Sequence, residues 1–219
     1  MSPHRPSNCD GLNQNGGHQQ ISSQPIRQDF FARDVTTVAR ELPGMLLCRR
    51  SRQGLTIGRI VETEAYLAKG DSASHSVRGI NRKNASMFGP PGRAYVYTIH
   101  ARQCFNIVTE PENVASAVLI RSVEPVHGIR LMEQRRGTFK TRDLCRGPAR
   151  LCEALDIGRD FDGWDLTTQR RLWIAADTTG NDFRINKSPR IGVTSAEESM
   201  LRFFLLDNEF VSGPKSLNR

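Results

Sequence analysis

The chain has 219 residues, 37% of them hydrophobic, which is enough for one well-buried domain and too short for two large ones. Thirty-one basic residues against 23 acidic ones give a formal net charge of +8, which favours a polyanionic partner such as nucleic acid. The longest apolar stretches, such as Phe203–Leu206, are far shorter than a membrane span, and five cysteines without a CxxC pair argue against a disulfide framework. These features exclude a secreted mini-scaffold, a collagen, a coiled coil and a membrane protein.

The first 28 residues are rich in Asn, Gln, Ser, Gly, Pro and His. Their few apolar side chains cannot offset the entropy lost on ordering, and the apolar core of a secretory signal is missing. We therefore expect a disordered tail over residues 1–28 and a single domain over residues 29–219.

Secondary structure is expected from residue 29 onward. Apolar residues at 35, 38, 39 and 42 recur at the spacing of one helix face, with Asp34 as the N-cap and Pro43–Gly44 as the end. Further strands are expected at 45–50, 55–66, 94–99, 117–123, 173–176, 190–193 and 201–206, and further helices at 126–136 and from Pro148 to before Gly158. Strands outnumber helices without a βαβ rhythm, so the predicted fold class is α+β, with a single mixed domain and a largely antiparallel sheet flanked by helices.

The middle of the chain combines aromatic rings with positive charge. All three tyrosines lie between Tyr66 and Tyr97, and no acidic residue occurs between Asp71 and Glu110. The same acid-free segment holds Arg78, Arg82, Lys83, Arg93 and Arg102. Nucleic-acid channels combine cations for the phosphates with rings on which bases stack. The alternative is that the cations only solvate loops and the rings only pack in the core.

Glu62, Glu64 and Tyr66 alternate along an expected strand and so share one of its faces. Two carboxylates and a phenol beside a basic segment form a candidate site for a polyanionic substrate. The alternative is the solvated face of an amphipathic strand. His75, His100 and Cys104 lack the spacing of a zinc site, and we expect no metal.

Several motifs resemble one known family in chain order. The sequence ETEAY at Glu62–Tyr66 is followed by His75–Ser76 and by YVY at Tyr95–Tyr97. With these motifs, the chain from about residue 29 to 212 resembles the alkyladenine (3-methyladenine) DNA glycosylase family. The other matching positions are Met87–Phe88 before Pro91–Gly92, Asn106, Leu119–Arg121 before Glu124–Pro125, Gly147–Cys152 and Pro189–Val193.

The resemblance implies a curved antiparallel sheet and a monofunctional enzyme. Such an enzyme flips an alkylated purine out of duplex DNA and hydrolyses its N-glycosidic bond. By this resemblance, Glu64 is the general base on the attacking water, and Arg121 with the backbone carbonyl of Ile191 holds that water. Glu62 is then expected to be structural or to tune its neighbour.

The resemblance also assigns the base pocket. Tyr66 and Tyr97 would stack on the flipped base, His75 would face them and hydrogen-bond within the pocket, and Asn106 would screen the exocyclic groups of purines. One position departs from the family, which commonly has a wedge tyrosine three residues after the second tyrosine of YVY. Here that position is His100, in a stretch that is one residue shorter, and whether His100 or Arg102 fills the gap in the DNA stays open.

The expected partner is double-stranded DNA containing damaged purines, without a cofactor, without a membrane, and with the protein as a monomer. We expect it where genomic DNA is kept, in the cytoplasm and nucleoid or in a nucleus, and not secreted. Two other functions compete: a non-catalytic nucleic-acid-binding module with the same basic face, and a nuclease using Glu62 and Glu64 with Mg²⁺.

Overall fold

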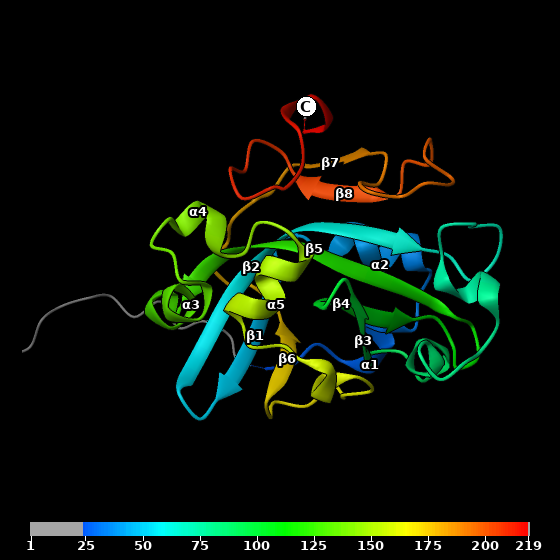
Figure 1. The fold of residues 1–219 in the computed structure, drawn as a ribbon, viewed down its shortest axis with the longest axis horizontal. Helices are drawn as coiled ribbons and strands as arrows, with labels where there is room; N and C mark the ends of the chain where they lie inside the picture. The colour runs from blue at the N-terminus through cyan, green and yellow to red at the C-terminus, as the bar shows by residue number, and fades with distance from the viewer. Residues whose placement is uncertain (1–23, 219) are drawn as a thin grey trace, which may run out of the picture.

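A computed structural model describes residues 24–218 of the chain. Its strands form one eight-stranded sheet in the order β3-β4-β5-β2-β1-β6, in which β8 also pairs with β2, and β7 with β8 (Figure 1). Every strand pair is antiparallel, which confirms the α+β class. The strands are β1 (Leu46–Ser51), β2 (Gly54–Tyr66), β3 (Ala94–Ile99), β4 (Arg102–Thr109), β5 (Ser116–His127), β6 (Leu172–Ala175), β7 (Ile185–Ser188) and β8 (Arg202–Leu205).

The helices are short and pack against the central strands. Helix α2 contacts β2 and β5, and α5 contacts β4 and β5. As predicted, the carboxylate of Asp34 caps α2 by accepting a hydrogen bond from Thr37 N at 2.9 Å. The helices are α1 (Gln28–Phe31), α2 (Val35–Glu41), α3 (Ile129–Arg136), α4 (Thr141–Leu144) and α5 (Pro148–Ala154), with 3₁₀ turns η1 (His75–Arg78), η2 (Ala85–Phe88), η3 (Arg159–Phe161) and η4 (Lys215–Leu217).

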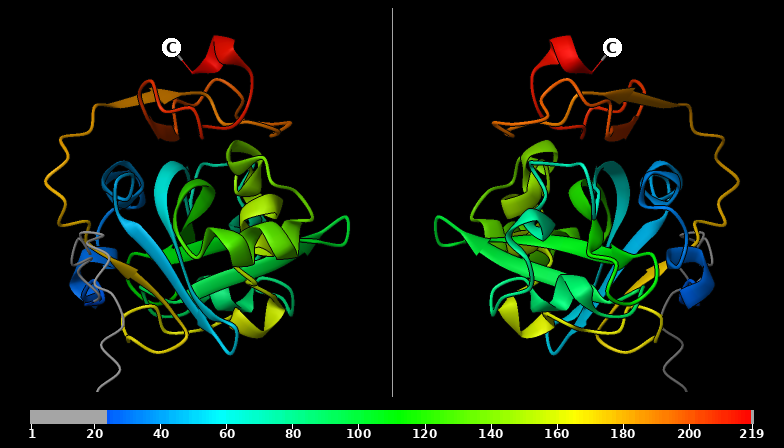
Figure 2. Two further views of the ribbon diagram at one scale, coloured as in Figure 1. Left: turned by 90° about the vertical axis from the view of Figure 1, so that its left-hand side faces the viewer. Right: turned by 90° about the vertical axis from the view of Figure 1, so that its right-hand side faces the viewer.

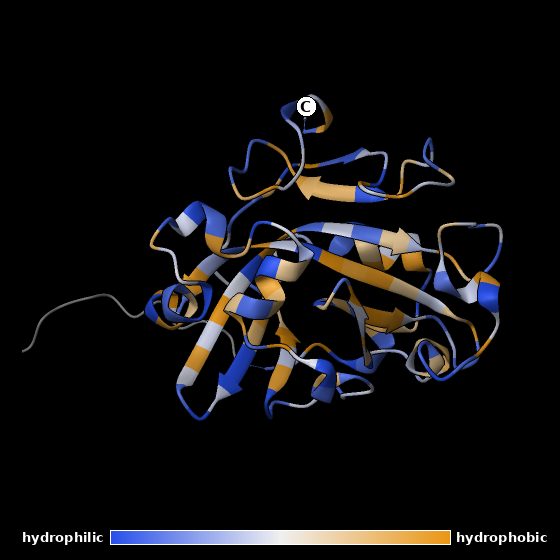
Figure 3. Cartoon of the chain, in the orientation of Figure 1, coloured by the Kyte–Doolittle hydropathy of each residue, from blue (hydrophilic) through white to orange (hydrophobic). Residues whose placement is uncertain are grey.

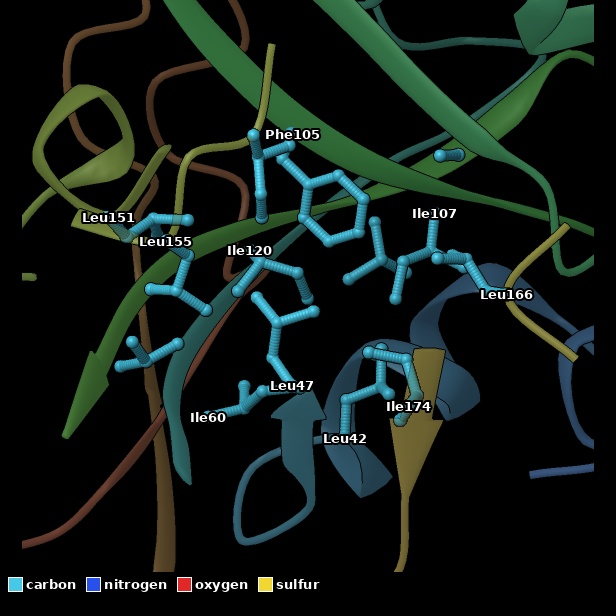
Figure 4. Packing of buried hydrophobic residues seen from close by; sticks show 14 of the residues in the cluster. Leu42, Leu47, Ile60, Phe105, Ile107, Ile120, Leu151, Leu155, Leu166 and Ile174 are labelled. Atoms are coloured by element: carbon cyan, nitrogen blue, oxygen red, sulfur yellow. The ribbon is translucent and has the colours of Figure 1, made fainter. Parts of the chain in front are cut away.

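The main core lies between the sheet and helices α2 and α5. Leu42 of α2, Leu151 of α5 and Ile120 of β5 belong to one cluster of buried side chains, which point toward one another in Figure 4. Hydrophobic residues run along β5, whereas the β1–β2 turn is hydrophilic (Figure 3). Alternation along β3 sends Ala94 and Val96 into this core and leaves the tyrosines of β3 to the opposite face.

Strand β2 is the central strand of the sheet, because it pairs with three other strands. One edge follows β5, and the other pairs first with β1 and then, at Glu62–Glu64, with β8. The long connection from β6 to β7 runs along one side of the molecule, so that β7, β8 and the C-terminal residues lie together at one end (Figure 2). The C-terminal segment is thereby placed beside the middle of β2.

Of the predicted tail at residues 1–28, residues 1–23 lie outside the described part of the chain. Of the remainder, Pro25 pairs with Ala175 and Ile26 N donates a hydrogen bond to Ile174 O at 2.8 Å, so this stretch lies against β6. In the described part of the chain, no helix has the length and apolar character needed to cross a membrane.

Two predictions on secondary structure were wrong, and two strands, β4 and β7, were missed. The segment at 190–193 is not a strand. The backbone N–H and carbonyl of Ile191 hydrogen-bond to the side chains of Glu64 and Arg121, and Gly192 has φ +77°. The helix predicted from Val126 begins only at Ile129, after Gly128, since β5 continues to His127. Strand β4 was not predicted, because the turn before it contains none of the Gly, Asn or Pro signals of a hairpin.

Candidate active site

Two bulges shape the centre of the sheet. Between β2 and β5, Ile60 pairs with Val123 and Glu62 with Ser122, and Thr63 already pairs with Ile120. One residue on each strand, Val61 on β2 and Arg121 on β5, therefore has no residue opposite. A bulge changes the direction of the side chain that it carries, and bulges are common beside active sites.

Glu64 lies at this irregular place, fully buried. Its Oε1 accepts a hydrogen bond from Ile191 N at 2.8 Å, and its Oε2 accepts one from the Tyr66 hydroxyl at 2.9 Å and one from Arg121 Nη1 at 3.3 Å. Glu62 is also fully buried, so the alternative of a solvated strand face is wrong. Glu62, Glu64 and Tyr66 share one face, as the alternation predicts, since both carboxylates contact Arg121.

Arg121 joins the groups around Glu64. Its Nη1 donates to the backbone oxygen of Ile191 at 3.2 Å, and its Nε donates to Ser212 Oγ at 3.2 Å. Burial would lower the pKa of Arg121, but the charges of Glu64 and Glu62 outweigh burial and raise it, so the guanidinium stays charged. The Glu64 carboxylate and the Ile191 carbonyl thus both lie within hydrogen-bond distance of one guanidinium.

Beside this cluster lies a pocket of about 250 Å³. Its wall includes Tyr66, His75, Tyr97 and Asn106, together with Met87, Ala117 and residues 192–195 of the loop that follows Ile191. Glu64 itself does not line the pocket. Tyr66, which donates a hydrogen bond to Glu64, lines it, and so does Gly192, which follows the other donor Ile191. The structure therefore brings together all four residues predicted to bind the base.

The aromatic rings of the pocket contact one another. The His75 ring lies 4.7 Å from that of Tyr97 in an edge-on arrangement, and His75 Nδ1 is 2.8 Å from the Tyr95 hydroxyl. Burial and the nearby Arg78 lower the pKa of His75, so its ring is neutral near pH 7. Burial raises the pKa of Tyr66 and of Tyr97 far above the usual value, with Glu64 adding to the rise at Tyr66. The rings of the pocket wall are thus uncharged, and Arg78, which also lines the pocket, is a charged but exposed side chain.

Asn106 is buried in β4, directly opposite Tyr95. Its Nδ2 donates to Tyr95 O at 2.9 Å, which fixes the amide against the backbone of β3. Sequence analysis did not predict this anchoring, because it depends on β4, which was not predicted.

His100 and Arg102 lie away from the pocket floor, at the tip of the β3–β4 hairpin. Ile99 pairs with Arg102, so His100 and Ala101 form a two-residue turn, and both have positive φ, 46° and 61°. His100, Ala101 and Arg102 are exposed, as is Ile99 at 50%, and Ile99 also lines the pocket. The hairpin tip therefore projects at the mouth of the pocket.

Sequence analysis missed a buried ion pair behind Tyr66. Arg190 donates two hydrogen bonds of 2.7 Å to the carboxylate of Asp71, and its guanidinium lies 4.6 Å from the centre of the Tyr66 ring. Arg190 also donates to Ala65 O at 3.0 Å. The pair thus supports one ring of the pocket. Because Arg190 directly precedes Ile191, the pair also fixes the chain next to Ile191.

Comparison with known sequences shows the family of this chain. The profile of the family described as methylpurine-DNA glycosylase (MPG) matches residues 29–209. Three relatives share the name "Putative 3-methyladenine DNA glycosylase". The one from Rhodopirellula baltica is 45% identical over 197 residues, which are 88% of this chain and 84% of the relative. The one from Granulibacter bethesdensis is 44% identical and covers 90% and 91% of the two chains, and the one from Mesorhizobium japonicum is 42% identical and covers 88% and 92%. With its profile match and these long alignments, the chain belongs to the methylpurine-DNA glycosylase family.

Proposed function

We propose that this DNA glycosylase removes alkylated purines of the 3-methyladenine type from duplex DNA, by flipping the damaged base into the pocket and hydrolysing its N-glycosidic bond with a water activated by Glu64. One observation carries the proposal: a fully buried carboxylate, held by Arg121 and Ile191 N, adjoins a pocket walled by Tyr66, His75 and Tyr97. The names of the relatives agree with this substrate class.

The uncharged aromatic rings of the wall favour a cationic base. Alkylation at N3 or N7 gives a purine a positive charge, and a cation over a tyrosine ring gains up to about 2 kcal/mol when it is desolvated. Stacking itself contributes about 1–3 kcal/mol per base, against a cost of a few kcal/mol for extrusion. Because His75 is neutral near pH 7, it adds no repulsion to a cationic base.

The hydrolytic step follows from the three converging groups. A water inserted among them would donate its protons to the Glu64 carboxylate and the Ile191 carbonyl and accept a hydrogen bond from Arg121, leaving a lone pair for the sugar C1′. As the C1′–N bond breaks, its electron pair goes to the purine, which leaves neutral. The oxygen then bonds to C1′ and Glu64 takes the proton, so one carboxylate is enough.

The remaining residues position the base and the DNA. His75 Nδ1 is engaged with Tyr95, so the other ring nitrogen would bond to the base. The anchored amide of Asn106 would screen exocyclic groups. His100 or Arg102, at the exposed hairpin tip, would fill the gap left by the flipped base. We further propose that the enzyme is monofunctional, acts as a monomer without a cofactor, and works where genomic DNA is kept.

The test is release of free methylpurine from methylated duplex DNA in a buffer with EDTA. We expect release by the wild type and loss of it in Glu64→Gln, which keeps the shape of the side chain but cannot accept the proton. Glu124→Gln is the matched control, since Glu124 pairs with Arg59 and does not contact Arg121. Substantial release by Glu64→Gln would contradict the proposed base, and tight binding without release by the wild type would favour the binding module. Strand cleavage that EDTA abolishes would favour the nuclease.

A further inference from the structure

Glu62 is a second buried carboxylate next to the proposed base, and the hydrolytic step does not use it. Its Oε1 accepts a hydrogen bond from Arg202 Nε at 2.6 Å and lies 3.2 Å from Arg121 Nε. Its Oε2 accepts a hydrogen bond from Ser212 N at 2.7 Å. Both oxygens are therefore held in place, by hydrogen bonds from β8 and from the C-terminal segment and by the charge of Arg121 on β5.

Arg121 is shared between the two carboxylates. Its Nε edge faces Glu62, and its Nη1 faces Glu64 at 3.3 Å. The side chains of Glu62, Glu64 and Arg202 are fully buried, and that of Arg121 is 12% exposed. The result is a buried row of alternating charge: Glu64, Arg121, Glu62, Arg202.

Arg202 fixes the far end of this row. Besides Glu62, its guanidinium donates to four oxygens at 2.7–3.1 Å, and none of them belongs to Glu64. The four acceptors are Ser188 Oγ, Leu217 O, Ser212 O and Asn218 Oδ1. Arg202 is thus committed to Glu62 and to the C-terminal segment.

A guanidinium that paired with Glu64 alone would stabilise the carboxylate anion and so make it a poor acceptor of a proton. Glu62 acts against this in two ways, since it attracts part of the Arg121 charge and repels the anion of Glu64. We propose that Glu62 is a positioning residue, which holds Arg121 by its Nε edge and divides the guanidinium charge so that Glu64 remains basic enough to take a proton from water. This inference rests on the proposed function.

The other groups around Glu64 leave this role to Glu62. Burial raises the pKa of the Tyr66, Tyr97 and Cys104 side chains, so these are neutral near pH 7. Arg190 is charged but is neutralised by its two hydrogen bonds to Asp71. The groups that face Glu64 are Tyr66 of β2, Tyr97 of β3, Cys104 of β4, Arg121 of β5, and Arg190 and the Ile191 backbone of the loop after β7.

The test is the pH dependence of single-turnover release of 7-methylguanine, a cationic lesion that needs no acid to leave. For the wild type, release should fall at low pH as Glu64 becomes protonated. In Glu62→Gln we expect this acid limb to move to lower pH, because Glu64 is then the carboxylate that pairs with the Arg121 charge, and the plateau rate to fall several-fold. Glu62→Asp keeps the charge and should restore the limb toward the wild-type position.

Loss of stability must be separated from this effect. Arg49→Gln is the matched control, since Arg49 is a buried arginine paired with Asp156 away from the site, and its loss should lower the thermal unfolding temperature without moving the acid limb. If Glu62→Gln does not fold because Arg202 is left unpaired, the double variant Glu62→Gln/Arg202→Gln replaces it and should move the limb in the same direction.

The outcomes distinguish the two proposals. An acid limb at the wild-type pH in the Glu62 variants, whatever their loss of rate, would overturn the positioning role and leave Glu62 with a structural one. Failure of the wild type to release 7-methylguanine at any pH would overturn the proposed function, and the inference with it.

Discussion

At the level of single residues, the buried ion pair of Asp71 and Arg190 supports the Tyr66 ring in the pocket wall. Burial alone would raise the pKa of Asp71, but the hydrogen bonds from Arg190 and from the backbone N–H groups of Leu67 and Ala73 outweigh it and lower the pKa below 3.8. A carboxylate with a lowered pKa stabilises the folded state at every pH above its unfolded value. That contribution is lost as the pH falls through the folded value.

Asp71→Asn should therefore lower the free energy of unfolding by about 3 kcal/mol at pH 7, because Arg190 is left buried without a countercharge. Urea denaturation at pH 7, 5, 4 and 3 measures this. The difference from the wild type should be constant down to about pH 4 and shrink at pH 3, below the 3.8 of the unfolded carboxyl. The exposed pair of Asp207 and Arg184 is the control, and Asp207→Asn should cost less than about 1 kcal/mol. A difference that grows toward pH 3 would contradict this account.

Some of these residues were predictable and others were not. The shared face of Glu62, Glu64 and Tyr66 follows from strand alternation alone, a local rule. The partners Arg190 and Arg202 lie more than a hundred residues away in the chain, and no local pattern marks an arginine that will meet a carboxylate at that distance. Their positions depend on how β8 and the loop before it return to β2.

At the level of elements, the hairpin of β3 and β4 carries local strain at its tip. Two-residue turns of this kind favour Asn and Gly, because both positions have positive φ, and here they are His100 and Ala101. A left-handed conformation costs a non-glycine residue about 1–2 kcal/mol. The tip lies at the mouth of the pocket, and strained turns are often found at such functional places.

Ala101→Gly should raise the free energy of unfolding by about 0.5–1 kcal/mol, because glycine adopts φ near 61° without strain. Ala149→Gly, in the first turn of α5, is the opposite control and should lower it by about 1 kcal/mol. Both values come from urea denaturation. Equal destabilisation by the two substitutions would show that the turn is not strained.

The elements themselves were predicted where their signals are local. The cap of α2, the β1–β2 hairpin and β3 follow from Asp34, from the turn ending at Gly54 and from alternation. Strand β4 was missed because His100–Ala101 is an atypical turn. The segment at 190–193 resembles a strand in composition, but its backbone bonds to Glu64 and Arg121 replace the ladder.

At the level of the whole molecule, the net charge of +8 and the acid-free segment fit the DNA substrate of the family. The connection from η1 to η2 joins two segments that line the pocket and carries Arg82 and Lys83, both exposed. Arg52 is also exposed, but it lies in the β1–β2 turn, where β2 begins, whereas Tyr66 lies at the other end of that strand (Figure 1).

The double variant Arg82→Gln/Lys83→Gln should weaken DNA binding and reduce the slope of log K against log salt by about 1–2, since each phosphate contact contributes about one counterion. Fluorescence anisotropy with a lesion duplex at 50–200 mM salt measures this. Arg52→Gln should leave the slope unchanged. A slope that changes equally in both variants would mean that DNA binding depends on the overall positive charge and not on contacts at Arg82 and Lys83.

The attachment of the C-terminal segment to Arg202 also bears on how the protein is made. Leu217 and Asn218 bond to the arginine that holds Glu62, which lies on the second strand of the chain. On a ribosome, β2 emerges long before these last partners. The buried charges around Glu64 can therefore be completed only after residue 218 has left the exit tunnel, and an interrupted translation product that carries every pocket residue still lacks the finished site.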